Sequence, residues 1–229
     1  MQRLVLLRHG ESIYNQKNLF TGVHDVELTE KGKKQAQQVR LLCRHCSIDY
    51  ALSSNLRRST QTREIALQAY PSPIRLSEHS ELNERDYGAL NGTCKQTAVS
   101  QYGEEQVQRW RRGFFDRPPG GASLSDTYQC VTDFYIRTVE PLLSQRKNVL
   151  IVAHGNSLRA LAGYLLTARY DVFHEIEIAW CAPWVFTIHK NKITQLDIYS
   201  NDCSQAKNSI HASSEIIVRH HTTLEYTPV

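Results

Sequence analysis

The sequence predicts a single α/β domain, with a mostly parallel central sheet and helices on both faces. Two short apolar runs, residues 4–7 and 149–153, carry this prediction, because an uninterrupted apolar run is typical of a strand buried on both faces. Each run leads into a His-Gly pair, so the same pattern occurs twice in the chain. Strand patterns alternate with helical patterns along most of the remaining sequence. The 229 residues suffice for one domain with a large core.

The order of elements follows from apolar spacing and from residues that begin or end helices. Thr29 is a favourable N-cap, Pro71 and Pro73 end a helix, and Pro141 kinks or divides another. We expect helices at residues 30–43, 58–69, 95–102, 104–112, 125–145 and 158–166, and loops at 11–26 and 81–92. We expect strands at residues 3–8, 49–53, 74–76 and 148–153, then a hairpin of 185–189 and 193–199. The domain spans residues 1–201, and the polar residues 202–229 are expected to form a weakly ordered tail.

Composition and charge are those of a soluble globular protein, with 41% hydrophobic and 22% charged residues. The net charge of +4 is too small to indicate a nucleic-acid partner and equally suits a small anionic substrate. The sequence contains neither a leader pattern nor an apolar run long enough to span a bilayer, so we expect no membrane partner and a cytoplasmic location. A homo-oligomer is left open.

Six cysteines are scattered along the chain, which does not indicate a disulfide framework. Cys43 and Cys46 have C-x-x-C spacing, but no second such pair completes a zinc site. We expect no bound metal, while a metal or redox role for this pair stays open as the less favoured interpretation.

The first His-Gly pair has the residue types of a phosphoryl-transfer site. If residues 3–8 form a strand, His9 lies at its carboxyl end, where parallel sheets open into a ligand crevice. A histidine can attack phosphorus and carry the phosphoryl group covalently, and Arg8 has the fork geometry that binds phosphate oxygens. Because His154 follows a similar strand, the two histidines are expected to face one another across the same crevice. A buried structural histidine is the alternative interpretation of His9 alone.

Several segments together resemble the cofactor-dependent phosphoglycerate mutases, which belong to the histidine phosphatase superfamily. In chain order they are residues 8–12 with Asn15, 20–22, 28–32, 82–92, 103–107, 110–113 and 153–161. The Arg-His-Gly signature marks only the superfamily, whereas residues 83–92 with Trp110-Arg111-Arg112 indicate the mutase branch. The resemblance implies a catalytic domain that interconverts 3-phosphoglycerate and 2-phosphoglycerate in glycolysis and gluconeogenesis. It also implies 2,3-bisphosphoglycerate as the priming cofactor and no requirement for a metal.

The resemblance further implies a role for each matching residue. His9 matches the phosphorylated nucleophile, whose other ring nitrogen should donate its proton to a backbone acceptor. Glu84 matches the general acid/base, and His154, as an imidazolium, would stabilise the transferring phosphoryl group. Arg8 and Arg58 would complete the clamp on that group. The remaining matched positions contact the substrate: Asn15, Thr21, Gly22, Arg85, Tyr87, Lys95, Arg111, Arg112, Gly155 and Asn156.

Each of these residues also has a simpler interpretation. Glu84 and Arg85 could form a solvated loop pair of little energetic weight, Arg111 and Arg112 could be an exposed helix face, and His154 could be a satisfied core histidine. Their joint order and spacing favour the functional interpretation.

Two departures from the family pattern leave rival functions open. The connection between Arg112 and Ser125 is short, as in a shorter form of the family, and residues 178–184 share only Pro183 with the usual Pro-Thr-Gly-x-Pro stretch. One rival is a phosphomonoesterase of the same superfamily, which would pass the phosphoryl group from a small phosphorylated metabolite to water. The other is a non-catalytic phosphate-binding or interaction protein, against which the complete His/Arg/Glu/His set argues.

Overall fold

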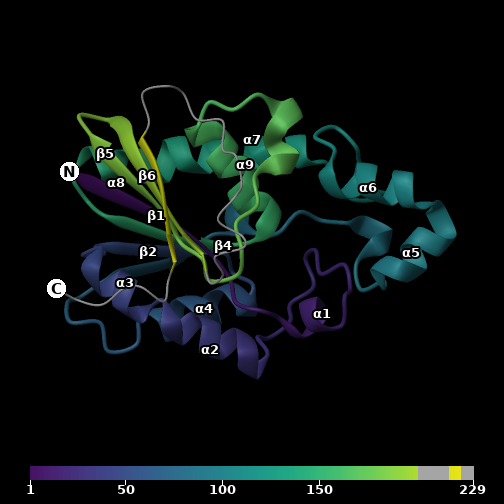
Figure 1. Ribbon diagram of the computed structural model, residues 1–229, viewed down its shortest axis with the longest axis horizontal. Coiled ribbons are helices and arrows are strands. Elements are labelled where there is room, and N and C mark those ends of the chain that lie inside the picture. The colour runs from purple at the N-terminus through teal and green to yellow at the C-terminus, as the bar shows by residue number, and fades with distance from the viewer. Residues whose placement is uncertain (201–216, 223–229) are drawn as a thin grey trace.

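A seven-stranded sheet in the order β3-β2-β4-β1-β5-β6-β7 forms the centre of the protein (Figure 1). The computed structural model describes residues 1–200 and 217–222. All strands run in one direction except β5, which is antiparallel to both β1 and β6, so the predicted mostly parallel α/β fold is confirmed. The strands are β1 (Gln2–Arg8), β2 (Tyr50–Ser53), β3 (Arg75–Glu78), β4 (Val149–Ala153), β5 (Trp184–His189), β6 (Lys192–Ser200) and β7 (Ile217–Thr222).

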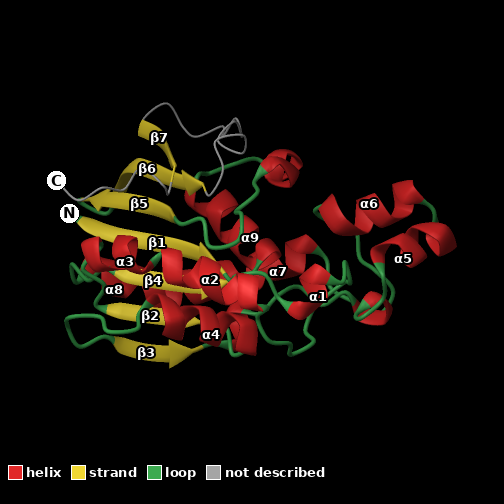
Figure 2. Cartoon of the chain, turned by 60° about the horizontal axis from the view of Figure 1, so that its bottom comes forward, coloured by secondary structure: helices red, strands yellow, loops and turns green. Residues whose placement is uncertain are grey.

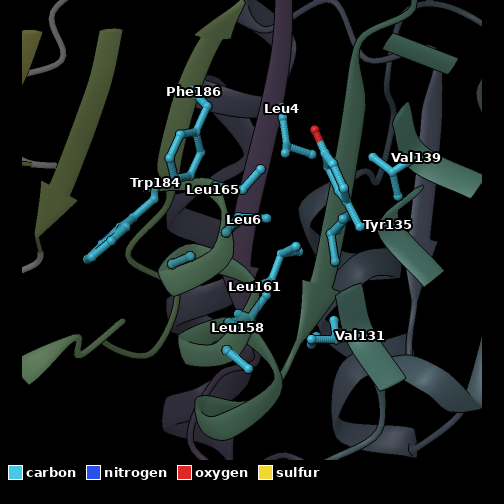
Figure 3. Close-up of a cluster of buried hydrophobic side chains, with 14 of the residues drawn as sticks. Leu4, Leu6, Val131, Tyr135, Val139, Leu158, Leu161, Leu165, Trp184 and Phe186 are labelled. Atoms are coloured by element: carbon cyan, nitrogen blue, oxygen red, sulfur yellow. The ribbon is translucent and has the colours of Figure 1, made fainter. Parts of the chain in front are cut away.

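Helices cover both faces of this sheet (Figure 1). One face is covered by α2 (Glu30–Gln38), α3 (Arg40–His45) and α4 (Arg57–Ala66), and the other by α7 (Leu124–Phe134), α8 (Glu140–Ser144) and α9 (Gly155–Leu165). Leu4 and Leu6 pack in the cluster with α7 and α9 (Figure 3), whereas Val5 and Leu7 pack in the cluster with α2, α3 and α4. Because successive side chains of β1 enter opposite clusters, residues 4–7 have to be apolar at every position.

Several helix boundaries differ from the predicted ones. The expected helix at 30–43 is divided at Val39 into α2 and α3, and the expected loop at 11–26 contains the short α1 (Ile13–Gln16). Helix α9 begins at Gly155 rather than at residue 158, because its first turn carries no apolar signal. The expected helix at 125–145 contains a π-helical segment, η3 (Tyr135–Val139), before α8, and Pro141 lies in the first turn of α8, where a missing N–H is tolerated.

The predicted C-terminal hairpin is present, and a further strand follows it. Strands β5 and β6 are joined through Lys190 and Asn191, whose φ angles of 49° and 62° suit the tight turn of a hairpin. Residues 217–222, expected to belong to a weakly ordered tail, instead form β7, which pairs in parallel with β6. This pairing supplies hydrogen-bond partners to an otherwise open sheet edge. The rest of that expected tail, residues 202–216 and 223–229, lies outside the described residues.

A helical pair extends beyond the carboxyl ends of β1 and β4 (Figure 2). It consists of α5 (Lys95–Tyr102) and α6 (Glu104–Arg112) and has a small core of its own, which includes Phe20, Tyr87 and Trp110. The chain reaches it from β3 through two short 3₁₀ turns, η1 (Ser80–Leu82) and η2 (Gly88–Leu90); a third, η4 (Tyr170–Glu175), follows α9. The pair therefore stands over the strand ends that carry the two histidines. Over the described ranges, no helix combines the length and apolar character that a bilayer crossing requires.

Candidate active site

The two histidines lie side by side at the carboxyl ends of β1 and β4. These strands are adjacent and parallel, with Arg8 in register with Ala153, and the His9 N–H donates to the Ala153 carbonyl at 3.0 Å. The ring centroids of His9 and His154 are 4.9 Å apart. The expectation that the repeated His-Gly pattern would bring both rings to one crevice is confirmed.

His9 has the tautomer and charge state that a nucleophile needs. Its Nδ1 lies 2.7 Å from the Gly10 carbonyl oxygen, which can only accept, so the ring proton is on Nδ1 and Nε2 carries the lone pair. Burial, together with the positive charges of Arg58 and Arg8, lowers the pKa of His9 well below its usual value. The imidazole is therefore neutral at physiological pH.

His154 differs from the expected imidazolium. Its Nε2 lies 2.7 Å from the Ser54 hydroxyl, which also accepts the Leu56 N–H. Burial and the charge of Arg58 lower the pKa of His154 well below its usual value, so this ring too is neutral in the absence of a ligand. In the tautomer that carries its proton on Nδ1, Nε2 of His154 accepts the Ser54 hydroxyl and Nδ1–H is left to donate to a ligand. His154 can thus donate one hydrogen bond to a phosphoryl oxygen without carrying a full charge.

Unsatisfied N–H groups surround these rings. Among the described residues, the buried Nε atoms of Arg8 and Arg58 and the Nδ1 atom of His154 have no hydrogen-bond partner. An unpaired buried donor is costly unless a ligand satisfies it. Burial lowers the pKa of Arg58 to about 10, which leaves the guanidinium charged at neutral pH. Two guanidinium groups and one imidazole can therefore bind an anion next to Nε2 of His9.

Glu84 lines the cleft and belongs to the loop after η1. Its Oε1 accepts the backbone N–H of Arg85 at 2.9 Å and that of Asn156 at 3.2 Å. Because Asn156 is in the first turn of α9, the carboxylate is held where a helix favours negative charge. Within the described part of the chain Oε2 has no protein donor, so it can exchange a proton with a bound hydroxyl.

One cleft collects most of the predicted site residues. Lys95 comes from the first turn of α5, and Arg111 and Arg112 from the last turn of α6. Burial and the nearby charge of Arg111 lower the pKa of Lys95. The cleft thus has five cationic side chains and two carboxylates, which suits a polyanionic ligand. The predicted residues that line it are Arg8, Asn15, Thr21, Gly22, Glu84, Tyr87, Lys95, Arg111, Arg112, Gly155 and Asn156.

Two predicted contact residues lie beneath the cleft instead of lining it. Arg85 is 2% exposed and donates to the carbonyls of Trp110 and Arg111 at 2.7 and 3.2 Å and to the Tyr87 hydroxyl at 2.9 Å. Arg85 therefore holds the end of α6 in place. The substrate contact expected of it stays a prediction, because its Nε and Nη1 atoms have no hydrogen-bond partner among the described residues. Arg58 is 0% exposed and donates to the carbonyls of Gly22 and His24, so it also supports the wall of the cleft.

The structure adds two residues that the sequence did not indicate as functional, Arg159 and Glu177. Both line the cleft, and the Nη2 of Arg159 lies 2.8 Å from Oε2 of Glu177. Arg159 follows Asn156 by one helical turn, a spacing that could have placed both side chains on one face of α9. Glu177 lies in an irregular connection, where no periodic signal could have identified it.

Within residues 1–200 and 217–222, no three His, Cys, Asp or Glu side chains are grouped so that they could hold a metal ion. The C-x-x-C cysteines belong to a buried core cluster, with Cys43 on α3 and Cys46 directly after it. Burial, with a smaller contribution from Cys46, raises the pKa of the Cys43 thiol to about 12, which favours a structural thiol.

Comparisons with known proteins identify relatives of this chain. The profile described as the histidine phosphatase superfamily (branch 1) matches residues 4–201. A relative from Bartonella bacilliformis is 45% identical over 201 residues, which cover 84% of this chain and 98% of the relative. A relative from Cytophaga hutchinsonii is 42% identical over 186 residues, covering 81% and 87%. Both are named 2,3-bisphosphoglycerate-dependent phosphoglycerate mutase. Among solved structures, the alpha-ribazole phosphatase from Shigella flexneri is 26% identical with a TM-score of 0.72, covering 83% of this chain and 93% of that one.

Proposed function

Because the chain belongs to the histidine phosphatase superfamily, and within it to the family of 2,3-bisphosphoglycerate-dependent phosphoglycerate mutases, we propose that it interconverts 3-phosphoglycerate and 2-phosphoglycerate. The resemblance inferred from the sequence is confirmed by this membership, while the reaction is our proposal. One observation carries it: a neutral, oriented His9 directly follows Arg8, and Arg8 lines one cleft together with a second group of cations on α5 and α6. A mutase needs both, because its bisphosphorylated intermediate must stay bound while it turns round.

The reaction begins with His9 phosphorylated on Nε2. Glu84 accepts the proton of the C2 hydroxyl of 3-phosphoglycerate as that oxygen attacks phosphorus and the bond between phosphorus and Nε2 breaks. The product of this step is 2,3-bisphosphoglycerate, and its C3 phosphate must then move to His9. Nε2 attacks that phosphorus, the bond to the C3 oxygen breaks, and Glu84 returns the proton to the leaving oxygen. The net result is 2-phosphoglycerate and a regenerated phosphohistidine.

The surrounding residues supply the charge that this transfer requires. Arg8, Arg58 and His154 donate hydrogen bonds to the transferring phosphoryl oxygens through the buried N–H groups that lack protein partners among the described residues. The negative charge of a bound phosphoryl group raises the pKa of His154, which moves this ring toward the imidazolium expected from the sequence. Lys95, Arg111 and Arg112 hold the distal phosphate and carboxylate. The same donors suit 2,3-bisphosphoglycerate as the primer that first phosphorylates His9.

A phosphomonoesterase is the second candidate function. It is favoured by the same fold in a solved structure named as a phosphatase and by a carboxylate, Glu177, among the cations of the cleft. A coupled assay with 3-phosphoglycerate separates the two, since the mutase requires catalytic amounts of 2,3-bisphosphoglycerate, whereas the phosphatase releases inorganic phosphate without it.

Labelling tests the chemistry common to both candidates. Incubation with 2,3-bisphosphoglycerate should add one phosphoryl group that is acid-labile and alkali-stable, and His9→Ala should abolish it. Ser80→Ala, a change in η1 outside the cleft lining, is the control and should label normally. A label that persists in the His9→Ala protein would contradict the assignment of His9 as the nucleophile.

A further inference from the structure

Glu177 places a carboxylate among the arginines of the cleft. Its Oε1 lies 3.2 Å from Nη1 of Arg8, and its Oε2 lies 2.8 Å from both Nη1 of Arg112 and Nη2 of Arg159. The side chain lines the same cleft as Glu84 and Lys95. It therefore bridges an arginine of the proposed phosphoryl clamp and an arginine of the proposed distal clamp.

The three arginines are not equivalent partners. Arg159 has a side chain only 7% exposed and uses its other nitrogens on the Ile176 carbonyl and on Oδ1 of Asn156, so it is a fixed anchor for Glu177. Arg112 has a side chain 38% exposed, and Glu177 is its ion-pair partner in the described structure. An incoming anion can thus compete with Glu177 for Arg112 without disturbing Arg159.

The segment that follows Glu177 keeps the carboxylate in place. The Ile178 carbonyl accepts from Nη1 of Arg8 at 3.0 Å, and the Trp180 ring lies 5.6 Å from the Arg8 guanidinium carbon. The Cys181 N–H donates to the Arg8 carbonyl at 3.0 Å. The segment after Glu177 is therefore held against Arg8 by two hydrogen bonds and one cation–π contact. These contacts keep the Glu177 carboxylate next to the arginines.

Glu177 is ionised at every physiological pH. Burial alone would raise its pKa, but the positive charges of Arg159 and Arg8 and the hydrogen bond from Arg112 lower it to about 2. A fixed negative charge in a partly dehydrated cleft repels other anions, and the repulsion grows with the charge of the ligand. It also occupies a guanidinium that the ligand would otherwise use.

We propose that Glu177 is a specificity-determining residue: a built-in anion that competes with bound polyanions for Arg112 and disfavours more highly charged ligands over less charged ones. The identity of the natural ligands rests on the proposed function. The ion pairs of Glu177 with the three arginines do not depend on that function. Its consequence is an enzyme that holds the bisphosphate less tightly than its cluster of cations alone would. The intermediate would then escape to solvent, or remain exposed to water, more often.

Equilibrium binding tests this without any chemistry. The test uses the His9→Ala protein, which cannot take up a phosphoryl group. Calorimetry measures the dissociation constants of 2,3-bisphosphoglycerate and 3-phosphoglycerate for this protein with and without the additional change Glu177→Gln. We expect the dissociation constant of the bisphosphate to fall about tenfold, equivalent to about 1.4 kcal/mol, and that of the monophosphate to fall about threefold. Added salt should narrow the difference. Glu175→Gln, which removes a charge two residues away outside the cleft lining, should change neither constant.

Two results would overturn the proposal. If Glu177→Gln weakens both ligands, or shifts both by the same factor, Glu177 only positions the arginines. Pyrophosphate and inorganic phosphate form a second pair of probes that differ in charge and do not depend on the natural substrate. If the protein binds neither phosphoglycerate, the proposed function fails, while unequal tightening of pyrophosphate over phosphate would still support Glu177 as the discriminating anion. Glu177→Asp keeps the charge and should retain most of the discrimination, which separates charge from folding effects.

Discussion

Arg85 offers the sharpest test of how the fold positions the distal clamp. Its guanidinium is buried, donates to the Trp110 and Arg111 carbonyls and to the Tyr87 hydroxyl, and lies 4.5 Å from the Tyr87 ring centroid. In Arg85→Lys the charge is kept, but a single ammonium cannot reproduce the planar fork that reaches several acceptors. Carbonyls at the end of α6 then lose their donor.

The magnitude follows from those contacts. Leaving a buried acceptor unpaired costs about 1–3 kcal/mol, so we expect Arg85→Lys to lose roughly 2–4 kcal/mol of unfolding free energy. For a chain of this size each kcal/mol corresponds to about 2–4 °C in Tm, which predicts a fall of roughly 4–16 °C by calorimetry. Because α6 carries Arg111 and Arg112, KM for 3-phosphoglycerate should rise about tenfold, with a smaller effect on kcat.

Arg109→Lys is the matched control, since Arg109 is on the same helix but its side chain is 61% exposed and paired with Asp116. That change should leave Tm within about 1–2 °C, because exposed ion pairs contribute little. An unchanged Tm in Arg85→Lys would refute the assigned anchoring role. A lowered Tm with an unchanged KM would show that the end of α6 does not determine substrate binding.

Three further predictions concern charge and cofactor. Since burial and the neighbouring arginines lower the pKa values of His9 and His154 below 6.5, the unfolded chain binds protons first as the pH falls through that value, and the folded state loses stability. Denaturant titrations should thus show the free energy of unfolding decreasing from pH 7 to pH 5, less steeply in His154→Asn; equal slopes would contradict this. Arg111→Ala and Arg112→Ala should each lower mutase flux tenfold to a hundredfold and raise the ratio of hydrolysis to transfer, while phosphoenzyme formation at saturating donor falls much less. Wild-type mutase rates in both variants would mean that these arginines are an ordinary exposed helix face and do not bind the substrate. EDTA should leave the primed rate unchanged and vanadate should inhibit, whereas loss in EDTA with recovery on adding manganese would disprove the metal-independent mechanism.

The sequence by itself determined the strand ends and the chemistry placed there. Residues 4–7 and 149–153 are apolar throughout because both faces of β1 and β4 are buried, and that pattern is visible without coordinates. The carboxyl ends of parallel strands lie at one edge of a sheet, so two His-Gly pairs after two such strands were expected at the same edge. The strand order, in which β4 is next to β1, then brings the two rings to 4.9 Å. Local pattern and a single topological rule therefore placed His9, His154 and the neighbouring Arg8 at one edge of the sheet.

Only the tertiary structure decided the roles of residues whose partners are distant in sequence. Arg85 and Arg111 are both conspicuous in the sequence, but which one supports and which one lines the cleft depends on how α6 packs on Tyr87. Glu177 meets Arg8, separated from it by 169 residues, and an ion pair between an irregular connection and a strand end leaves no periodicity to detect. Charge states behave likewise: burial beside Arg58 makes His154 neutral, and burial is a property of the packed chain.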